Sequence, residues 1–216
     1  MHAYVVNLDK EKQRWIEMKK EFKGSGINLR RFSAIKDTVG GYGLIQSFIA
    51  VIKEAQEKKL KHVLILEDDI HLTKGWSERW SKICKWLHAN PTAWDIYSGG
   101  GWGIFMPHEI AKIDDITLYD PLVSLSTHWL YINSNCYNSL INFLNRVKEY
   151  IKLPIVGDLF ALDNCLCLYK TLVSYPFVAY QKNTVSSIKN YYRKDNMQTF
   201  KNAEKSLGRT RKNVKN

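Results

Sequence analysis

No run of apolar residues in the 216-residue chain approaches the ~20 residues that a helix needs to span a bilayer. The first strand-like segment begins at Ala3, which leaves no room for a signal peptide, so we expect a cytoplasmic protein. Internal repeats and Pro-, Gly- or Ser-rich linkers are also absent. With 45% hydrophobic and 25% charged residues, the chain is neither fibrous nor wholly disordered, and its length suits one domain around a single core.

Cysteine is scarce, with four residues in the whole chain. Cys165 and Cys167 are separated by one residue in an apolar stretch, which matches no common zinc-binding spacing. We therefore expect reduced thiols rather than a disulfide framework or a zinc site.

Negative charge is also in short supply, and the net charge of +11 is unevenly distributed. Residues 193–216 hold eight Lys or Arg and two acids, a net +6, which leaves +5 for the rest of the chain. Terminal segments with so few apolar residues are usually solvated. A weak attraction to an anionic surface is a more plausible role for this segment than nucleic-acid binding, although the latter stays open as an alternative.

Strand-like and helical segments alternate along the chain. The expected strands are 3–8, 29–35, 62–66, 94–97 and 128–133, with a late strand within 171–180. The expected helices are 10–23, which Asp9 would cap, 44–58, 76–88, 136–151 and 158–168. This order predicts an α/β fold, with a mostly parallel sheet, helices on both faces and ligands at the carboxyl ends of the strands.

Three consecutive acids, Glu67, Asp68 and Asp69, follow the apolar segment 63–66. Adjacent carboxylates repel one another unless a cation lies among them, and oxygen ligands suit Mg²⁺ or Mn²⁺. Since alternate residues of an extended chain point the same way, Glu67 and Asp69 can share one ligand. An acidic turn that caps the next segment is the alternative.

Other segments carry weaker signals. Asn7 stands at the exit of the first strand and Arg14 in the following helix, where they would serve a nucleotide pocket or simply cap the helix and face solvent. The loop 40–43 lacks the glycine patterns of P-loops and dinucleotide-binding folds.

In order along the chain, these segments resemble those of glycosyltransferase family 25, which includes lipopolysaccharide and collagen galactosyltransferases. The resemblance covers roughly residues 3–190, so we assign 1–192 to a glycosyltransferase domain and 193–216 to a basic C-terminal tail. The matching segments are Val5-Val-Asn-Leu-Asp with Arg14-Trp15, Phe32-Ser-Ala34 with Asp37, 40–47, Leu64-Ile-Leu-Glu-Asp-Asp-Ile70, Trp94-Asp-Ile96, Thr127–Ile132, Leu153-Pro154 with Asp158, and Tyr180-Gln181 with Ser187-Ile188. The chain departs from the family pattern at Leu44 and Phe48, where the family has Cys and His, and in a longer Pro-to-Asp spacing before Asp158.

The resemblance implies a single GT-A-like nucleotide-binding domain that uses a UDP-sugar and Mn²⁺ or Mg²⁺, with inversion at the sugar. The implied metal ligands are Asp69, Glu67 and Gln181, with Asp68 near the ribose or sugar. The implied donor pocket comprises Val6, Asn7, Leu8, Arg14 and Ala34. The acceptor would be a glycan, as in lipopolysaccharide biosynthesis, or a hydroxylated protein. Residues 98–103 would form the acceptor wall, because their glycines let a bulky sugar approach the backbone.

Inverting transfer needs a base that takes a proton from the acceptor hydroxyl. We expect Asp158 in this role, because it stands at a predicted helix entrance and matches the family segment, although a plain helix cap is the alternative. Two other functions remain open: a nucleotidyl or phosphoryl transferase using the same acids, and a catalytically inactive nucleotide-sugar-binding module.

Overall fold

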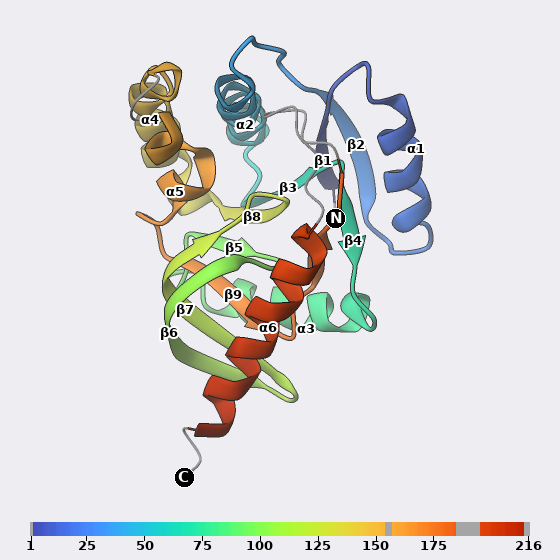
Figure 1. Ribbon diagram of the computed structural model, residues 1–216, viewed down its shortest axis with the longest axis vertical. Helices are drawn as coiled ribbons and strands as arrows, with labels where there is room; N and C mark the ends of the chain where they lie inside the picture. Colours follow the sequence, from blue (N-terminus) through green and yellow to red (C-terminus); the bar gives the residue numbers. More distant parts are fainter. Residues whose placement is uncertain (1, 154–156, 185–194, 214–216) are drawn as a thin grey trace.

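The computed structural model describes residues 2–153, 157–184 and 195–213 (Figure 1). The strands are β1 (His2–Asn7), β2 (Asn28–Ser33), β3 (His62–Glu67), β4 (Ile70–Leu72), β5 (Ile96–Ser98), β6 (Trp102–Ile113), β7 (Ile116–Leu125), β8 (Trp129–Asn133), β9 (Thr171–Tyr175) and β10 (Ala179–Gln181). The helices are α1 (Lys12–Glu21), α2 (Gly40–Glu57), α3 (Trp76–Ala89), α4 (Tyr137–Val147), α5 (Leu162–Leu166) and α6 (Asn196–Asn213). Three short 3₁₀ helices, η1 (Ser134–Cys136), η2 (Tyr150–Lys152) and η3 (Gly157–Phe160), complete the described elements.

The described strands form one large mixed sheet and one small sheet. The large sheet has the order β2-β1-β3-β8-β5-β9-β7-β6, in which all strands except β8 and β7 run in one direction. The small sheet pairs β10 with β4 in antiparallel fashion. The predicted α/β class and mainly parallel sheet are confirmed.

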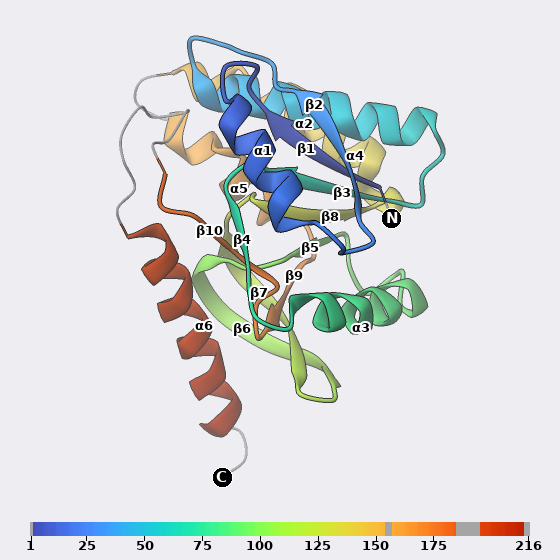
Figure 2. The same cartoon turned by 90° about the vertical axis from the view of Figure 1, so that its right-hand side faces the viewer.

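Helices cover both faces of the sheet because β1 and β3 are apolar on both sides. Tyr4 and Val6 belong to the core under α2, α4 and α5, whereas Ala3 and Val5 belong to the core under α1 and α3. Figure 2 shows α2 and α4 above the sheet and α3 below it. Buried strands of a largely parallel sheet show such continuous apolar runs.

The chain changes direction within the sheet at β1. From β1 it passes through α1 to β2 on one side, and then through α2 to β3 on the other. The carboxyl ends of β1 and β3 therefore lie side by side at a point where the two connections diverge. Ligand sites of open α/β sheets form in the crevice at such a point.

Two local predictions are wrong. Residues 40–43, expected to form a loop, are the first turn of α2, where a side chain on Gly43 would meet the Ile35 carbonyl oxygen at 2.3 Å. Asp9 does not cap α1, which begins at Lys12 without a side-chain cap. The Asp9 carboxylate instead accepts hydrogen bonds from Arg31 and Ser33.

The expectation of a solvated C-terminal tail is wrong for residues 195–213. Helix α6 packs on the far half of the sheet, where Phe200 is fully buried and Leu207 almost so, beside Tyr119, Val173 and Phe177. Glu204 also holds α6 against the segment 177–180, because its carboxylate accepts hydrogen bonds from the Phe177 N–H and the Tyr180 hydroxyl. A few apolar residues at helical spacing suffice for this docking.

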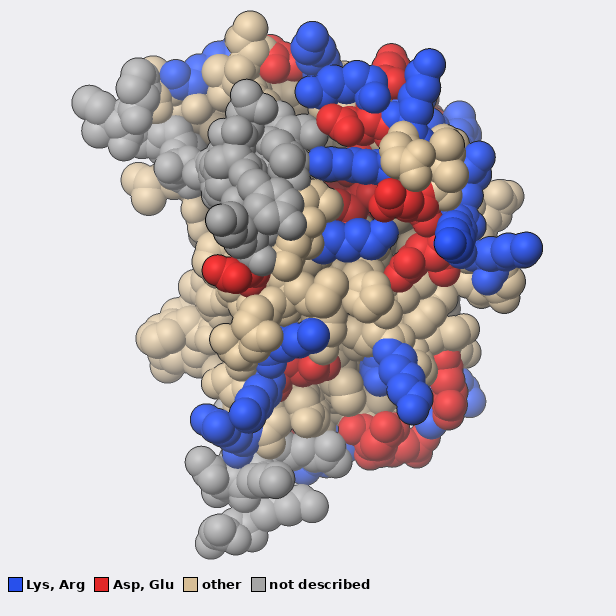
Figure 3. Space-filling view, turned by 45° about the vertical axis from the view of Figure 1, so that its right-hand side comes forward, with Lys and Arg blue, Asp and Glu red and all other residues tan. Residues whose placement is uncertain are grey.

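Basic side chains follow the outer side of α6, at the lower left of Figure 3. Lys201, Lys205 and Arg209 are exposed at i, i+4 and i+8, and none of them forms an ion pair with a residue that the structure describes. Contact between this side and an anionic surface stays a prediction. None of the described helices has the length and the apolar character required to traverse a bilayer.

We expect Phe200→Ala to destabilise the protein by about 3–5 kcal/mol, because it removes a fully buried ring and leaves a cavity. Lys201→Ala, at the exposed neighbouring position, should change stability by less than about 0.5 kcal/mol. Urea unfolding monitored by tryptophan fluorescence measures both. Equal stabilities of the two variants would contradict the packing of α6.

Candidate active site

The three consecutive acids lie where β3 ends, at the divergence point of the sheet. Asp68 and Asp69 form the turn between β3 and β4, and both are buried. A buried carboxylate needs hydrogen bonds or a nearby positive charge, because burial removes its hydration. The partners of the three acids come from segments far away in the sequence, and they fall into two groups.

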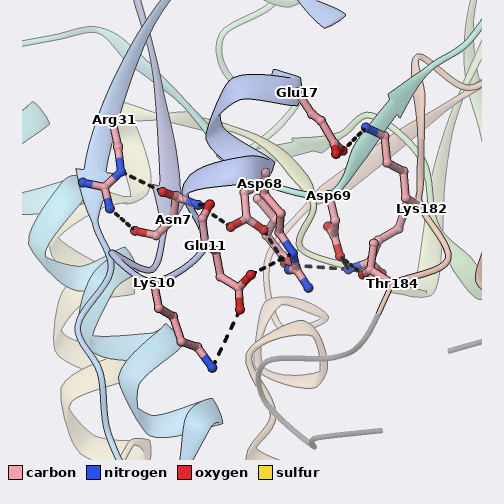
Figure 4. Close-up of polar contacts among 12 residues, drawn as sticks. Asn7, Lys10, Glu11, Glu17, Arg31, Asp68, Asp69, Lys182 and Thr184 are labelled. Carbon is pink, nitrogen blue, oxygen red and sulfur yellow. Dashed lines mark hydrogen bonds and ion pairs between the residues drawn. The ribbon is translucent and has the colours of Figure 1, made fainter. Parts of the chain in front are cut away.

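Asp68 is held from the side of β1 and α1 (Figure 4). Its carboxylate accepts a hydrogen bond from Asn7 Nδ2 at 2.7 Å and forms an ion pair with Arg14 Nη1 at 3.1 Å. Asn7 is itself buried, and its Oδ1 accepts from Arg31 Nε of β2 at 2.7 Å. Arg14 also lies 3.7 Å from Glu11. Asp68 therefore orders the end of β1 and the first turn of α1.

Glu67 and Asp69 turn to the other side and meet at one amide. Gln181 Nε2 lies 3.3 Å from Glu67 Oε2 and 3.2 Å from Asp69 Oδ2. The Thr127 hydroxyl donates to Glu67 and the Thr184 hydroxyl donates to Asp69 at 3.1 Å. Glu67, the last residue of β3, and Asp69, in the turn that follows, therefore share one hydrogen-bond donor. That they share a cation stays a prediction.

The small sheet explains why Gln181 reaches this position. Strand β10 pairs with β4 so that Gln181 stands opposite Ile70, and the next N–H, of Lys182, donates to the Asp69 carbonyl oxygen at 2.7 Å. Lys182 also forms an ion pair with Glu17 of α1 at 3.4 Å. Ladder hydrogen bonds therefore fix the position of the amide beside the acids.

The acids and their neighbours perturb one another electrostatically. Burial raises the pKa of Asp69 to about 6, and the negative charge of Asp68 adds to the rise. Burial also raises the pKa of Asp68, although Asn7 and Arg14 oppose it. The pKa of Arg14 is raised despite burial, because Asp68 stabilises its charge. Asp69 thus carries a poorly compensated negative charge, which a bound cation would stabilise.

The donor set fits a hard divalent cation. Glu67, Asp69 and Gln181 can offer two carboxylates and an amide oxygen, with the Thr184 hydroxyl beside them. Within the described parts of the chain, no group of three or more His, Cys, Asp or Glu side chains is arranged to hold a metal ion. Mg²⁺ commonly binds through only one or two carboxylates together with water and substrate phosphates, so two acids suffice.

The residues expected to form a nucleotide pocket lie near the end of β1, but their side chains differ in burial. The side chain of Val6 is buried in the core beneath α2, whereas Leu8 is half-buried just beyond β1. The Ala34 N–H donates to the Asn7 carbonyl oxygen at 3.0 Å, which joins the ends of β1 and β2. Asp158 falls in η3, and its side chain lies outside the described residues.

Sequence reasoning missed Arg31, Thr127, Thr184 and Asn196, which all contact residues of the site. Arg31 had a usable signal, since residues on β2 that pair with the end of β1 must lie beside Asn7. Thr127 begins one of the resembling segments, but no role was assigned to it. Thr184 gave no signal, because a single hydroxyl in a loop becomes a partner only through the tertiary fold.

The run of glycines after β5 does not provide open space. A side chain on Gly99 would meet the Trp129 ring at 2.5 Å, and one on Gly100 would meet the Ala179 carbonyl oxygen at 2.4 Å. These glycines let β8 and β10 approach β5 closely. Gly99 and Gly100 therefore leave no room for a sugar, and the acceptor wall expected at residues 98–103 is wrong at these two positions.

His128 is a core residue at the entrance of β8. It is fully buried, its Nδ1 is the partner of the Ser126 hydroxyl, and its Nε2 lies 3.3 Å from the Ala179 carbonyl oxygen. Its ring packs edge-on against Phe200. Burial lowers the pKa of His128 to about 4, so the imidazole is neutral at pH 7.

No protein-family model matches the chain, and no curated protein matches it. Among solved structures, it is similar to a glycosyltransferase involved in the glycosylation of the major capsid of PBCV-1, with 12% identity, a TM-score of 0.44 and coverage of 71% of this chain and 68% of that one. The protein A197 from STIV is 10% identical over 84% of both chains, with a TM-score of 0.42. The CTP:phosphocholine cytidylyltransferase from Streptococcus pneumoniae is 12% identical over 95% of this chain and 78% of that one, with a TM-score of 0.39. Values this low carry no conclusion about activity.

We expect the buried neutral His128 to make stability fall in acid. Because its pKa is about 4 in the folded state and about 6.5 in the unfolded chain, the unfolded chain binds the extra proton between these values. This one group should lower the free energy of unfolding by about 2 kcal/mol from pH 7 to pH 5. Denaturant unfolding at the two pH values should show a smaller drop for His128→Asn than for the wild type or for His108→Asn, an exposed histidine. Identical drops in all three proteins would refute this assignment.

Proposed function

We propose that this protein is a metal-dependent glycosyltransferase that moves a sugar from a UDP-sugar to a hydroxyl acceptor, with inversion of the anomeric carbon. The observation that carries the proposal is the meeting of Glu67 and Asp69 at Gln181, beside the joined ends of β1 and β3. The ordered motifs that resemble glycosyltransferase family 25 include these residues and Asn7.

In this proposal, Glu67, Asp69 and Gln181 would hold Mn²⁺ or Mg²⁺, which would neutralise the charge of the departing UDP. Asp68 has a different role from its neighbours. It keeps Asn7 and Arg14 in place, so that the end of β1 is rigid where the nucleotide would lie. A rigid pocket lowers the entropy lost when a ligand binds.

The donor pocket would be lined by Val6, Asn7, Leu8 and Ala34. The Val6 side chain is committed to the core and the Asn7 side chain to Asp68 and Arg31, so these two residues would shape the base of the pocket. Arg14 would attract the diphosphate, since the Asp68 carboxylate orients its guanidinium at the edge of the site.

Asp158 is our proposed general base for the acceptor hydroxyl. The support is its place in the resembling segment and a position before α5, which packs on the same face of the sheet as α2. The proposed acceptor is a glycan or a hydroxylated protein, and we propose a cytoplasmic location.

The test is release of UDP from a panel of UDP-sugars, with and without Mn²⁺. Wild type should release UDP from one sugar in the presence of Mn²⁺, and Asp69→Asn should reduce the rate by at least about a hundredfold, because it removes a charge that holds the cation. Asp115→Asn, an exposed change in the turn between β6 and β7, should retain the wild-type rate.

Other outcomes of this assay would contradict the proposal. UDP that raises the melting temperature without any release across the panel, acceptors included, would favour the inactive nucleotide-sugar-binding module. Neither release nor a thermal shift would overturn the nucleotide-sugar proposal. Loss of release in Asp115→Asn as well would assign the effect of Asp69→Asn to general loss of structure.

A further inference from the structure

The amide of Gln181 faces the two carboxylates with its nitrogen. Nε2 lies 3.2–3.3 Å from oxygens of Glu67 and Asp69 and donates hydrogen to both. An amide nitrogen cannot bind a cation, whereas the amide oxygen of the same side chain can. The observed orientation therefore joins the carboxylates to each other and excludes Gln181 from a cation's ligands.

A residue of α6 fixes this orientation. Asn196, the first residue of the helix, donates from Nδ2 to Gln181 Oε1 at 3.3 Å. Since Oε1 accepts from Asn196, Nε2 is the atom left to face the acids. The position of Asn196 is in turn set by the packing of Phe200 and by Glu204, both on α6.

Two amides in contact can form their hydrogen bond in either sense. Each carries one donor group and one acceptor, so rotation of both by half a turn keeps a hydrogen bond, with Gln181 Nε2 now donating to Asn196 Oδ1. Gln181 Oε1 then faces Glu67 and Asp69. The rotated arrangement offers three oxygen ligands at one point, while the observed one offers two oxygens separated by a donor.

We infer that Asn196 and Gln181 form a two-position amide pair that sets the cation affinity of the acid site, with Asn196 as a positioning residue. Without a cation, Asn196 donates and Gln181 holds the carboxylates together. With a cation, both amides are reversed and Gln181 becomes a ligand through Oε1. The inference rests on the proposed function only for the presence of a cation site and requires no particular sugar or acceptor.

Asn196→Asp distinguishes the two arrangements of the amide pair, because an ionised carboxylate accepts hydrogen bonds but cannot donate them. It should hold Gln181 with Nε2 toward residue 196 and Oε1 toward the acids. We expect the dissociation constant for Mn²⁺ alone, measured by electron paramagnetic resonance, to fall about fivefold to tenfold, the change that one hydrogen bond of ordinary strength produces.

The added negative charge needs its own control. Thr199→Asp places the same charge one turn further along α6, at an exposed position that does not contact Gln181 in the structure, and should change the constant less than about twofold. In a Gln181→Met background, which has no amide to reverse, Asn196→Asp should lose its advantage over Thr199→Asp.

A measurement without metal follows the same pair. The side-chain NH₂ resonances of Gln181 in a ¹⁵N correlation spectrum should move in Asn196→Asp and stay in place in Thr199→Asp. This spectrum also shows whether each variant is folded, so a weak Mn²⁺ signal from a misfolded variant is recognised.

Equal tightening by Asn196→Asp and Thr199→Asp, or tightening that persists in Gln181→Met, would overturn the inference. Absence of Mn²⁺ binding in both wild type and Asn196→Asp would overturn it as well. UDP release, assayed in parallel, separates the two proposals. Tightening by Asn196→Asp without any UDP release supports the amide pair and counts against the transferase, whereas metal-dependent release with unchanged Mn²⁺ affinity does the reverse.

Discussion

Three adjacent acids at the end of a buried strand are the constraint on which this structure depends. Each carboxylate loses hydration on folding, and the structure compensates each one from a different direction. The Asp68 carboxylate accepts hydrogen bonds from Asn7 and Arg14. Glu67 accepts one from Thr127 and Asp69 one from Thr184, and Gln181 donates to both of these acids. The acids thereby fix how the N-terminal βαβ unit, the entrance of β8 and the segment after β10 lie relative to one another.

The sheet places this cluster at the point where two helical connections leave it on opposite faces. Strands β1 and β3 run parallel side by side, while their helical connections cover opposite faces. The two connections diverge at the carboxyl ends of these strands, which is the position where open α/β sheets form their ligand sites. Burial raises the pKa of Asp69 to about 6, and its carboxylate accepts a hydrogen bond from Gln181 Nε2. Electrostatics and topology therefore favour a cation at the same point.

The sequence predicted those parts of the fold that depend on local pattern. The apolar runs at the first and third strands and the helical spacing after residue 44 define the α/β core. Contacts between segments far apart in the sequence could not be predicted from these local patterns. The long hairpin of β6 and β7 was missed because its strands are partly exposed and bent, with register shifts near Trp102 and Glu109. Helix α6 was taken for a solvated tail because charge dominates its composition, while its docking depends on two residues, Phe200 and Leu207.

The chemistry of Gln181 shows why the acid site and α6 belong to one system. An ionised carboxylate at this position would present an oxygen in either orientation, whereas an amide binds a cation only when its oxygen is the atom presented. A glutamine ligand therefore requires a neighbour that decides which atom faces the metal. Asn196 is that neighbour, and it reaches Gln181 only because the apolar side of α6 is anchored on β9 and the following loop. In the proposed cation site, the terminal helix, whose sequence is dominated by polar and charged residues, would thus determine which atom of Gln181 faces the acids.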